Sequence, residues 1–193
     1  MIDALIVGLG NPGKEYQRTR HNLGQECVGL LAQRAGETLK VGRDRAMVAD
    51  ARLCAKRVVL AFPITYMNES GQAVGALMRR HRLTDPARLI VIHDELDLPP
   101  GQVRIKVGGG LAGNNGLRSI TQHLKTQDYL RVRIGIGKPP GKEHGANHVL
   151  ARVSKAERAV FDAAVIEAAD AVEMILAEGP DAAMRHLHAP RDP

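Results

Sequence analysis

Short apolar runs alternate along the chain with longer segments in which apolar residues recur every three or four positions. The short runs are rich in valine and isoleucine, as is typical of strands that are buried on both faces. They cover residues 4–7, 58–62, 89–92 and 132–136. The longer segments, residues 23–35, 71–82 and 116–125, have the spacing of amphipathic helices. This alternation predicts an α/β fold in which helices flank a mixed, mostly parallel central sheet.

Two further patterns refine this fold. Residues 47–55 and 58–62 form adjacent strand patterns with a tight connection at Lys56-Arg57, which predicts an antiparallel hairpin. Residues 154–178 are rich in alanine and predict one long C-terminal helix, capped by Ser154 and ended by Gly179-Pro180, with a short helix after it. Because no repeat or linker interrupts the chain, residues 1–193 are expected to form a single domain.

The composition narrows the class of protein. The first residues lack a basic segment followed by a long apolar one, and no run of about 18 apolar residues occurs, so we expect a cytoplasmic protein that does not span a membrane. Cys27 and Cys54 lack the spacing of metal ligands, and we expect both to be small core residues. We therefore expect no metal.

The positive charge of the chain is concentrated in one segment. Residues 98–144 contain eight lysines and arginines against Asp128 and Glu143, a local excess of +6 that equals the formal net charge of the whole chain. Such an excess predicts one face that meets an anion, and nucleic acid is the commonest large anion in a cytoplasm. The alternative is a solvated basic face without a partner.

Residues 5–13 read LIVGLGNPG, a strand pattern that runs into the G-x-G-x-x-G spacing of dinucleotide-binding loops. That site also needs a helix at the third glycine and an acidic residue about 20 positions later. Neither requirement is met, because residues 14–17 resemble a loop and residues 35–38, where a second strand ending in the acidic residue is expected, are polar. The first helix begins near Asn22, which with Gln25 predicts an N-terminal cap. We therefore interpret the glycines as a tight turn that presents Asn11, with a nucleotide-dependent oxidoreductase as the weaker alternative.

Two candidate catalytic residues follow predicted elements. His21 lies at the start of the first helix, where the positive end of the helix favours the neutral imidazole that a general base needs. Asp94 ends the strand that begins at Leu89, and ligand sites of α/β sheets lie at such strand ends. Neighbouring strand side chains point to opposite faces, so His93 should serve a different site, whereas Asp94 could meet His21 across adjacent strands.

The pair His93-Asp94 also resembles a metal-binding dipeptide of helical phosphohydrolases, but its position on a strand argues against a metal site. None of the three serines lies in a nucleophile elbow. A His-Asp pair without a side-chain nucleophile most simply activates water, which predicts hydrolysis of an activated acyl bond.

A loop with five glycines, residues 107–117, joins a strand pattern to a helix pattern and predicts either a mobile segment or a close approach to a ligand. Lys106 and Arg133 lie on predicted strands beside it, with phosphate oxygens or water as their partners. Asn68 is expected to be exposed at the end of another strand, where Tyr66 and Met67 would otherwise be core residues.

Several motifs, taken together, identify a family. They are VGLGNPG (7–13), EY (15–16), TRHN (19–22), TYMN (65–68), HDELDLPPG (93–101), NNGL (114–117) and RIGIGKP (133–139). In this order, and over nearly the whole chain, they closely resemble the motifs of the bacterial peptidyl-tRNA hydrolase family. The resemblance implies a monomeric cytoplasmic esterase, without a cofactor, that cleaves the bond between a peptide and the terminal ribose of tRNA.

The resemblance also implies roles for individual residues. His21 would be the catalytic base and Asp94 the carboxylate that orients it. Three asparagines, Asn11, Asn68 and Asn115, match those that bind the peptide, the water or the developing oxyanion. Tyr16 and Met67 match positions that line the cleft. Lys106 and Arg133 match the pair of cations that binds the tRNA 5′-phosphate.

The glycine-rich loop departs from the family pattern. Family members commonly carry histidines where this chain has Leu111 and Asn114, and glycine where it has Ala112. The low aromatic content argues against recognition by base stacking, so phosphate contacts and shape should hold the tRNA. The alternative function is a non-catalytic module of the same fold that binds structured RNA, against which the presence of both His21 and Asp94 argues.

Overall fold

The computed structural model describes residues 1–139, 141 and 145–189, so Lys142 and Glu143 of the basic segment lie outside the described residues. The described strands are β1 (Ala4–Gly8), β2 (Lys40–Val41), β3 (Ala46–Leu53), β4 (Lys56–Pro63), β5 (Leu89–Glu95), β6 (Val103–Val107) and β7 (Leu130–Gly135). The described α-helices are α1 (Leu23–Arg34), α2 (Ser70–Arg80), α3 (Asn115–Leu124), α4 (Gly145–Leu150), α5 (Lys155–Glu178) and α6 (Pro180–Leu187). Single 3-10 turns are η1 (Lys14–Tyr16), η2 (Arg20–Asn22), η3 (Met67–Glu69) and η4 (Pro86–Arg88).

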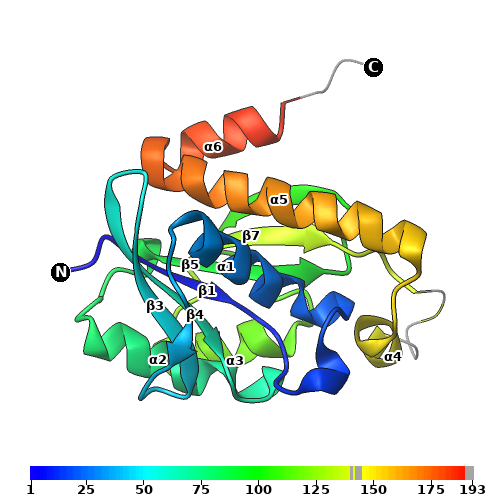
Figure 1. Cartoon of the computed structure of the whole chain (residues 1–193), viewed down its shortest axis with the longest axis horizontal. Coiled ribbons are helices and arrows are strands. Elements are labelled where there is room, and N and C mark those ends of the chain that lie inside the picture. Colours follow the sequence, from blue (N-terminus) through cyan, green and yellow to red (C-terminus); the bar gives the residue numbers. More distant parts are fainter. Residues whose placement is uncertain (140, 142–144, 190–193) are drawn as a thin grey trace.

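The strands form one mixed sheet in the order β2-β3-β4-β1-β5-β7-β6 (Figure 1). The central strands β4, β1, β5 and β7 run parallel, whereas the pairings β2–β3, β3–β4 and β6–β7 are antiparallel. The predicted α/β fold with a mixed sheet and a long C-terminal helix is therefore confirmed. Ser154 caps α5 as predicted, since its side chain accepts a hydrogen bond from the Glu157 amide.

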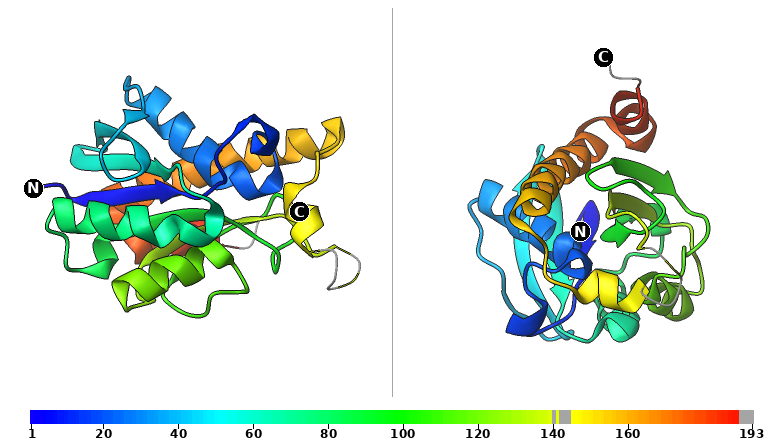
Figure 2. Two further views of the ribbon diagram at one scale, coloured as in Figure 1. Left: turned by 90° about the horizontal axis from the view of Figure 1, so that it is seen from below. Right: turned by 90° about the vertical axis from the view of Figure 1, so that its right-hand side faces the viewer.

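Helices cover both faces of the sheet (Figure 2). On one face, α1 and α5 pack on strand residues such as Ile6, Ile90 and Val132. On the other face, α2 and α3 pack on the alternating residues, for example Val7 and Val91. Since both faces of the central strands are buried, those strands read as continuous apolar runs. Their carboxyl ends meet the loops around η2 and α4 at one end of the molecule (Figure 1).

The β3–β4 hairpin is present, but its turn lies two residues earlier than predicted. Leu53 pairs with Lys56, so the turn residues are Cys54 and Ala55, both with positive φ (51° and 62°). Such a two-residue turn matches the twist of the paired strands, but neither residue is typical of it, which explains why the sequence did not reveal it. Cys27 is a fully buried core residue as expected, whereas the expectation for Cys54 was wrong because this residue is exposed.

The two edges of the sheet are limited in different ways. At one edge, β2 has only two residues in the described structure. At the other, the backbone N–H of Ile105 in β6 donates to Nε2 of His188, which directly follows α6, at 3.0 Å. A helix and a side chain thus lie along an edge that would otherwise present unpaired backbone groups.

The first glycine of the opening motif allows a close approach between β1 and α1. A Cβ added to Gly8 would lie 2.1 Å from the carbonyl oxygen of Gly24, and one added to Gly24 would lie 2.2 Å from the carbonyl oxygen of Ile92. The helix backbone therefore rests directly on the ends of β1 and β5, which places η2 beside those ends. The glycine at position 8 serves backbone packing, in agreement with the interpretation that the motif shapes a turn.

Gly24→Ala is expected to destabilise the protein by about 3 kcal/mol or more, because the added methyl group meets backbone atoms that have no room to move. Gly29→Ala in the same helix is the matched control, since a Cβ there has nothing within 4 Å. That change should stabilise the protein by about 0.5–1 kcal/mol. Urea unfolding of the two variants measures the difference, and equal free energies of unfolding would contradict the proposed contact.

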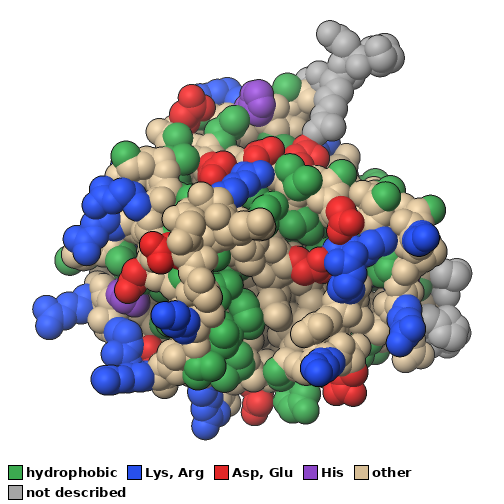
Figure 3. Space-filling model, in the orientation of Figure 1, with side chains coloured by type: hydrophobic (Ala, Val, Ile, Leu, Met, Phe, Trp, Pro, Cys, Tyr) green, Lys and Arg blue, Asp and Glu red, His purple; other side chains and the backbone are tan. Residues whose placement is uncertain are grey.

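Within the described part of the chain, no helix is both long and apolar enough to cross a membrane. On the face in Figure 3, lysine and arginine side chains gather toward the end where α2 and the N-terminus lie, and acidic side chains stand between the basic ones elsewhere. This face carries no continuous field of one sign.

Candidate active site

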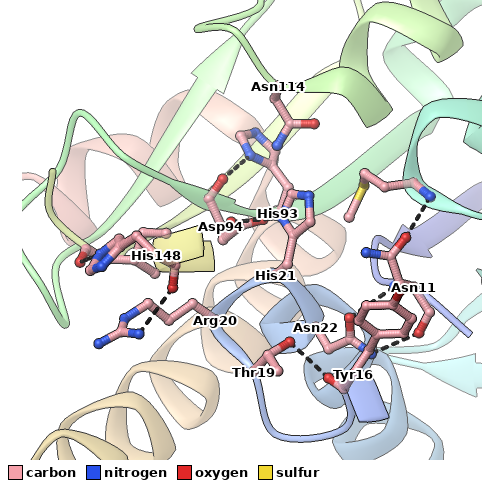
Figure 4. Close-up of polar contacts among 12 residues, drawn as sticks. Asn11, Tyr16, Thr19, Arg20, His21, Asn22, His93, Asp94, Asn114 and His148 are labelled. Atoms are coloured by element: carbon pink, nitrogen blue, oxygen red, sulfur yellow. Dashed lines mark hydrogen bonds and ion pairs between the residues drawn. The ribbon is translucent and has the colours of Figure 1, made fainter. Parts of the chain in front are cut away.

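His21 and Asp94 meet at the carboxyl ends of two adjacent parallel strands, β1 and β5. His21 lies in η2, between β1 and α1, and Asp94 is the sixth residue of β5. Nδ1 of His21 is 2.9 Å from both Oδ1 and Oδ2 of Asp94 (Figure 4). The structure thus brings together the two residues that the sequence placed on neighbouring strand ends.

The environment of the pair fixes how the imidazole can act. The side chains of His21 and Asp94 are 13% and 3% exposed. Because the carboxylate can only accept, Nδ1 carries the hydrogen that is donated to it, and Nε2 can accept a proton. Burial lowers the pKa of His21, but the charge of Asp94 and the hydrogen bond to it together outweigh burial, so the pKa is raised above 6.5. The predicted effect of the helix end, which favours the neutral ring, does not dominate.

His93 belongs to the opposite face of the sheet, as strand alternation predicted. It is 1% exposed, and its Nδ1 lies 2.8 Å from the backbone oxygen of Asp94. Burial lowers its pKa to about 4, so the ring is neutral near pH 7. His93 is therefore a buried neighbour of the site, without access to the cavities beside His21.

The side chain of Asn11 is held through its oxygen, which leaves the amide nitrogen available. The backbone N–H of Met67 donates to Oδ1 of Asn11 at 2.7 Å (Figure 4). A backbone N–H can only donate, so this contact fixes which end of the Asn11 amide is oxygen. Within the described structure, Nδ2 of Asn11 is then a free hydrogen-bond donor, and Asn11 and His21 line one cavity together.

Asn22 does not cap α1, which corrects the prediction. Its side chain instead accepts from the Asn11 backbone N–H at 2.8 Å and donates to the Asn11 carbonyl at 2.9 Å. The helix amide that a cap would have satisfied, that of Gln25, donates to the Leu9 carbonyl at 3.1 Å. The loop before the helix thus satisfies the helix amide, and the Asn22 side chain is free to hydrogen-bond the loop at Asn11.

Two cavities flank His21. The first, called the Asn68 cavity, has a volume of about 550 Å³ and is lined by His21 and by Asn11, Tyr66, Met67, Asn68, Glu69, Asn115, Ala146, Val149 and Leu150. The second, called the Asp94 cavity, has a volume of about 230 Å³ and is lined by His21 and by Asp94, Glu95, Leu96, Ala112, Gly113, Asn114, Asn115, Gly145, Ala146 and Val149. His21 and Asn115 contribute to both, so one imidazole can face ligand groups on two sides.

The predicted cleft residues are not all placed alike. Met67 is a buried wall of the Asn68 cavity, and Asn68 is exposed there as expected. Tyr16 lies in η1 beside Asn11 (Figure 4) but lines neither cavity. Tyr66, in contrast, is 56% exposed and lines the Asn68 cavity, so it is not an ordinary core residue.

Four cations of the basic segment project from β6 and β7 toward the face that α2 and α3 cover: Arg104, Lys106, Arg131 and Arg133. Arg133 pairs in register with Arg104, and Lys106 pairs with Arg131, so Lys106 and Arg133 share a face without being directly opposite. Nη1 of Arg133 lies 3.7 Å from Oε1 of Glu95. The strand positions predicted for Lys106 and Arg133 are confirmed.

Arg20 is a structural residue of the site that the sequence analysis missed. Its buried guanidinium donates to the His148 carbonyl in α4 at 3.0 Å and to Oε2 of Glu157 in α5 at 2.6 Å. Since α4 supplies a wall of both cavities, this contact fixes the wall beside the neighbouring His21. The partners of Arg20 are more than 120 positions away in sequence, so no local pattern indicates them.

The described residues contain no group of three or more His, Cys, Asp or Glu side chains that could hold a metal ion. The groups that the site does present are an imidazole oriented by a carboxylate, a donor amide at Asn11 and the amides of Asn68 and Asn115 around it. Such a set suits the attack of water on a carbonyl carbon and the stabilisation of the oxyanion that forms.

Comparisons with known proteins give matches over nearly the whole chain. The sequence model of the family described as peptidyl-tRNA hydrolase matches residues 5–193. A peptidyl-tRNA hydrolase from Frankia alni is 50% identical over 96% of this chain and 93% of its own length, and one from Nocardia farcinica is 51% identical over 96% of each chain. The crystal structure of peptidyl-tRNA hydrolase from Acinetobacter baumannii superposes with a TM-score of 0.92 at 38% identity, covering 99% of this chain and 98% of that one.

Proposed function

Because the chain belongs to the peptidyl-tRNA hydrolase family, we propose that His21 is the general base of its reaction and that Asp94 orients it. The protein is an enzyme that hydrolyses the ester bond between a peptide and the terminal ribose of tRNA, which releases both. The observation that carries the proposed mechanism is the 2.9 Å contact of Nδ1 with Asp94 at a position where His21 lines both cavities.

The reaction follows from the direction of this pair. Nε2 of His21 takes a proton from a water molecule as the water oxygen attacks the ester carbonyl carbon, and Asp94 stabilises the imidazolium that forms. When the tetrahedral intermediate collapses, the bond to the ribose oxygen breaks and the imidazolium returns the proton to that oxygen. The products are a peptide with a free carboxyl group and a tRNA with a free terminal hydroxyl.

The three asparagines supply neutral polar groups around the reacting carbonyl. Nδ2 of Asn11 is the oxyanion donor that the hydrogen-bond network supports best, because the contact with Met67 N–H fixes its direction. Asn68 and Asn115 line the Asn68 cavity with it and would bind the peptide or the water. A preorganised amide stabilises developing negative charge without a change in its own charge.

Lys106 and Arg133 are proposed to bind the 5′-phosphate at the acceptor end of the tRNA. Both lie on strands rather than on tails, so their backbone is already ordered and only the side chains lose freedom when phosphate binds. Phosphate contacts of this kind weaken steeply as salt rises. We further propose that the protein acts as a cytoplasmic monomer and that residues 1–193 work as one domain.

Lys106→Ala and Arg133→Ala should each raise KM for N-acetyl-aminoacyl-tRNA by roughly 10-fold, which corresponds to about 1.4 kcal/mol of binding, with a smaller effect on kcat. Each loss should also reduce the slope of log KM against log salt by about 1. Arg52→Ala, an exposed arginine on β3, is the matched control for a lost surface charge. An unchanged KM in both variants would show that the two cations do not contact the substrate.

The function itself is tested with the purified wild-type protein and N-acetyl-aminoacyl-tRNA. The expected result is release of the N-acetyl amino acid together with a tRNA that a synthetase can charge again. Filter binding of the same tRNA, measured in parallel, distinguishes hydrolysis from the alternative function of RNA binding without chemistry. Retained binding without release would favour a non-catalytic RNA-binding module.

A further inference from the structure

We infer that Arg131 is a positioning residue whose buried guanidinium holds the glycine loop (residues 108–114) in the shape that presents Lys106 and Asn115 to the substrate. This inference rests on the substrate contacts proposed above for those two residues. Arg131 itself touches neither cavity. It lies on β7, on the same face of the sheet as Lys106.

The guanidinium of Arg131 is surrounded by backbone carbonyl groups. Nη2 donates to the carbonyl of Gly109 at 2.8 Å and to that of Gln127 at 3.0 Å, and Nη1 donates to the carbonyl of Gly110. The guanidinium carbon lies 4.7 Å from the centre of the Tyr129 ring. The residue is 1% exposed, and no acidic side chain of the described residues forms an ion pair with it.

A cation at this position needs these partners. Moving a charge out of water is costly unless it is paired or hydrogen-bonded, and here carbonyl dipoles and a ring face replace the counter-ion. The contacts reach two separate segments, the glycine loop and the residue Gln127 before β7, so they also fix one segment against the other. The planar fork of arginine can reach several carbonyls at once, whereas a lysine ammonium is a point donor.

The glycine loop has few side chains of its own to hold it. Gly108, Gly109 and Gly113 adopt positive φ angles of 65°, 96° and 70°. A Cβ added to Gly110 or Gly113 would find nothing within 4 Å. Leu111 packs against the core, but its glycine neighbours have no side chains to pack and would sample many shapes unless hydrogen bonds restrict them. Arg131 holds the carbonyls of two of these glycines.

Both ends of the loop lead to residues of the proposed substrate site. At its start, the Lys106 side chain lies against Gly109, where an added Cβ would be 2.5 Å from Cε and 3.0 Å from Nζ. At its end, residues 112–115 line the Asp94 cavity, and Asn115 begins α3. Arg131 holds the loop between these two ends, so its removal should displace the phosphate contact and the amide together.

The test replaces Arg131 with lysine, which keeps the charge but not the fork. The expected result is a fall in kcat/KM for N-acetyl-aminoacyl-tRNA of about 10- to 100-fold per folded molecule, through both a higher KM and a lower kcat. The Gly108 amide donates to the Tyr129 carbonyl at 3.1 Å, and the Asn114 amide donates to the Leu111 carbonyl at 2.9 Å. Both amides should exchange hydrogen faster than in the wild type. Arg34→Lys, which alters an arginine that bridges α1 and α5, is the control and should change neither quantity.

A purely structural role would lower the melting temperature but leave kcat/KM per folded molecule and the loop exchange unchanged, and this outcome would overturn the inference. If the variant does not fold, NMR of the wild-type protein provides the test. The guanidinium protons of Arg131 should be protected from exchange with water, and rapid exchange would contradict the tether. The NMR and exchange measurements need no activity, so their failure is distinct from failure of the proposed reaction.

Discussion

Replacing His21 with alanine should lower kcat for hydrolysis of N-acetyl-aminoacyl-tRNA by about 10²- to 10⁴-fold, with little change in KM. The imidazole contributes to proton transfer in the transition state, whereas ground-state binding depends on the asparagines and cations around it. Single-turnover rates at saturating enzyme measure the loss directly, because they do not depend on product release.

His81→Ala provides a matched control, since this histidine lies at the end of α2, away from both cavities. Its rate should equal that of the wild type. A His21→Ala protein that binds tRNA normally but hydrolyses it at the wild-type rate would remove His21 from the mechanism and leave the cavity without a base.

Replacing Asp94 with asparagine should lower kcat/KM by about 10²-fold at pH 8 and move the acid limb of its pH profile. The amide can donate to Nδ1 of His21, which would place the ring hydrogen on Nε2 and remove the basic nitrogen from the cavity. If the amide oxygen accepts instead, the tautomer survives but the imidazolium loses its counter-charge. Both arrangements slow the reaction.

The direction of the pH shift follows from the causes of the His21 pKa. In the wild type, burial lowers the pKa of His21, and the charge and hydrogen bond of Asp94 raise it to a value above 6.5. The neutral base is lost as pH falls through that pKa, so kcat/KM should decline from above pH 6.5 downward. In Asp94→Asn, burial still lowers the pKa of His21 but the negative charge that raises it is gone. The acid limb should therefore move to lower pH.

Profiles of kcat/KM between pH 5 and 9, an interval chosen around the ordinary histidine pKa of about 6.5, measure this shift. Asp97→Asn removes a carboxylate in the turn after β5 that is paired with Lys138 at 3.0 Å, and its acid limb should coincide with that of the wild type. An acid limb that stays in place in Asp94→Asn would mean that another group sets the observed pKa.

The parts of the molecule that the sequence predicts are those with local signals. The valine- and isoleucine-rich runs identify β1, β4, β5 and β7, because strands buried on both faces need no polar alternation. The meeting of His21 with Asp94 follows from a simple rule, since the carboxyl ends of adjacent parallel strands share one edge of the sheet.

The parts that the sequence does not predict depend on distant partners. Asn22 has the residue type and spacing of a helix cap, yet its side chain hydrogen-bonds the backbone of Asn11 instead. The Gln25 amide of the helix donates to the Leu9 carbonyl. Arg131 belongs to a basic segment that suggested anion binding, but the pairing of β6 with β7 buries it beneath the glycine loop. Charge composition alone cannot separate such a buried cation from Lys106.

The protected edge of β6 has a consequence for the behaviour of the protein in concentrated solution. Exposed strand edges are templates for pairing with other chains, and aggregation commonly begins there. Here His188 accepts from Ile105 and α6 lies along the strand, while β2 at the opposite edge is too short to recruit a partner. Helix α6 therefore shields this edge, and we expect a chain shortened before Pro180 to aggregate at a lower concentration than the full chain, although its reacting groups are all retained.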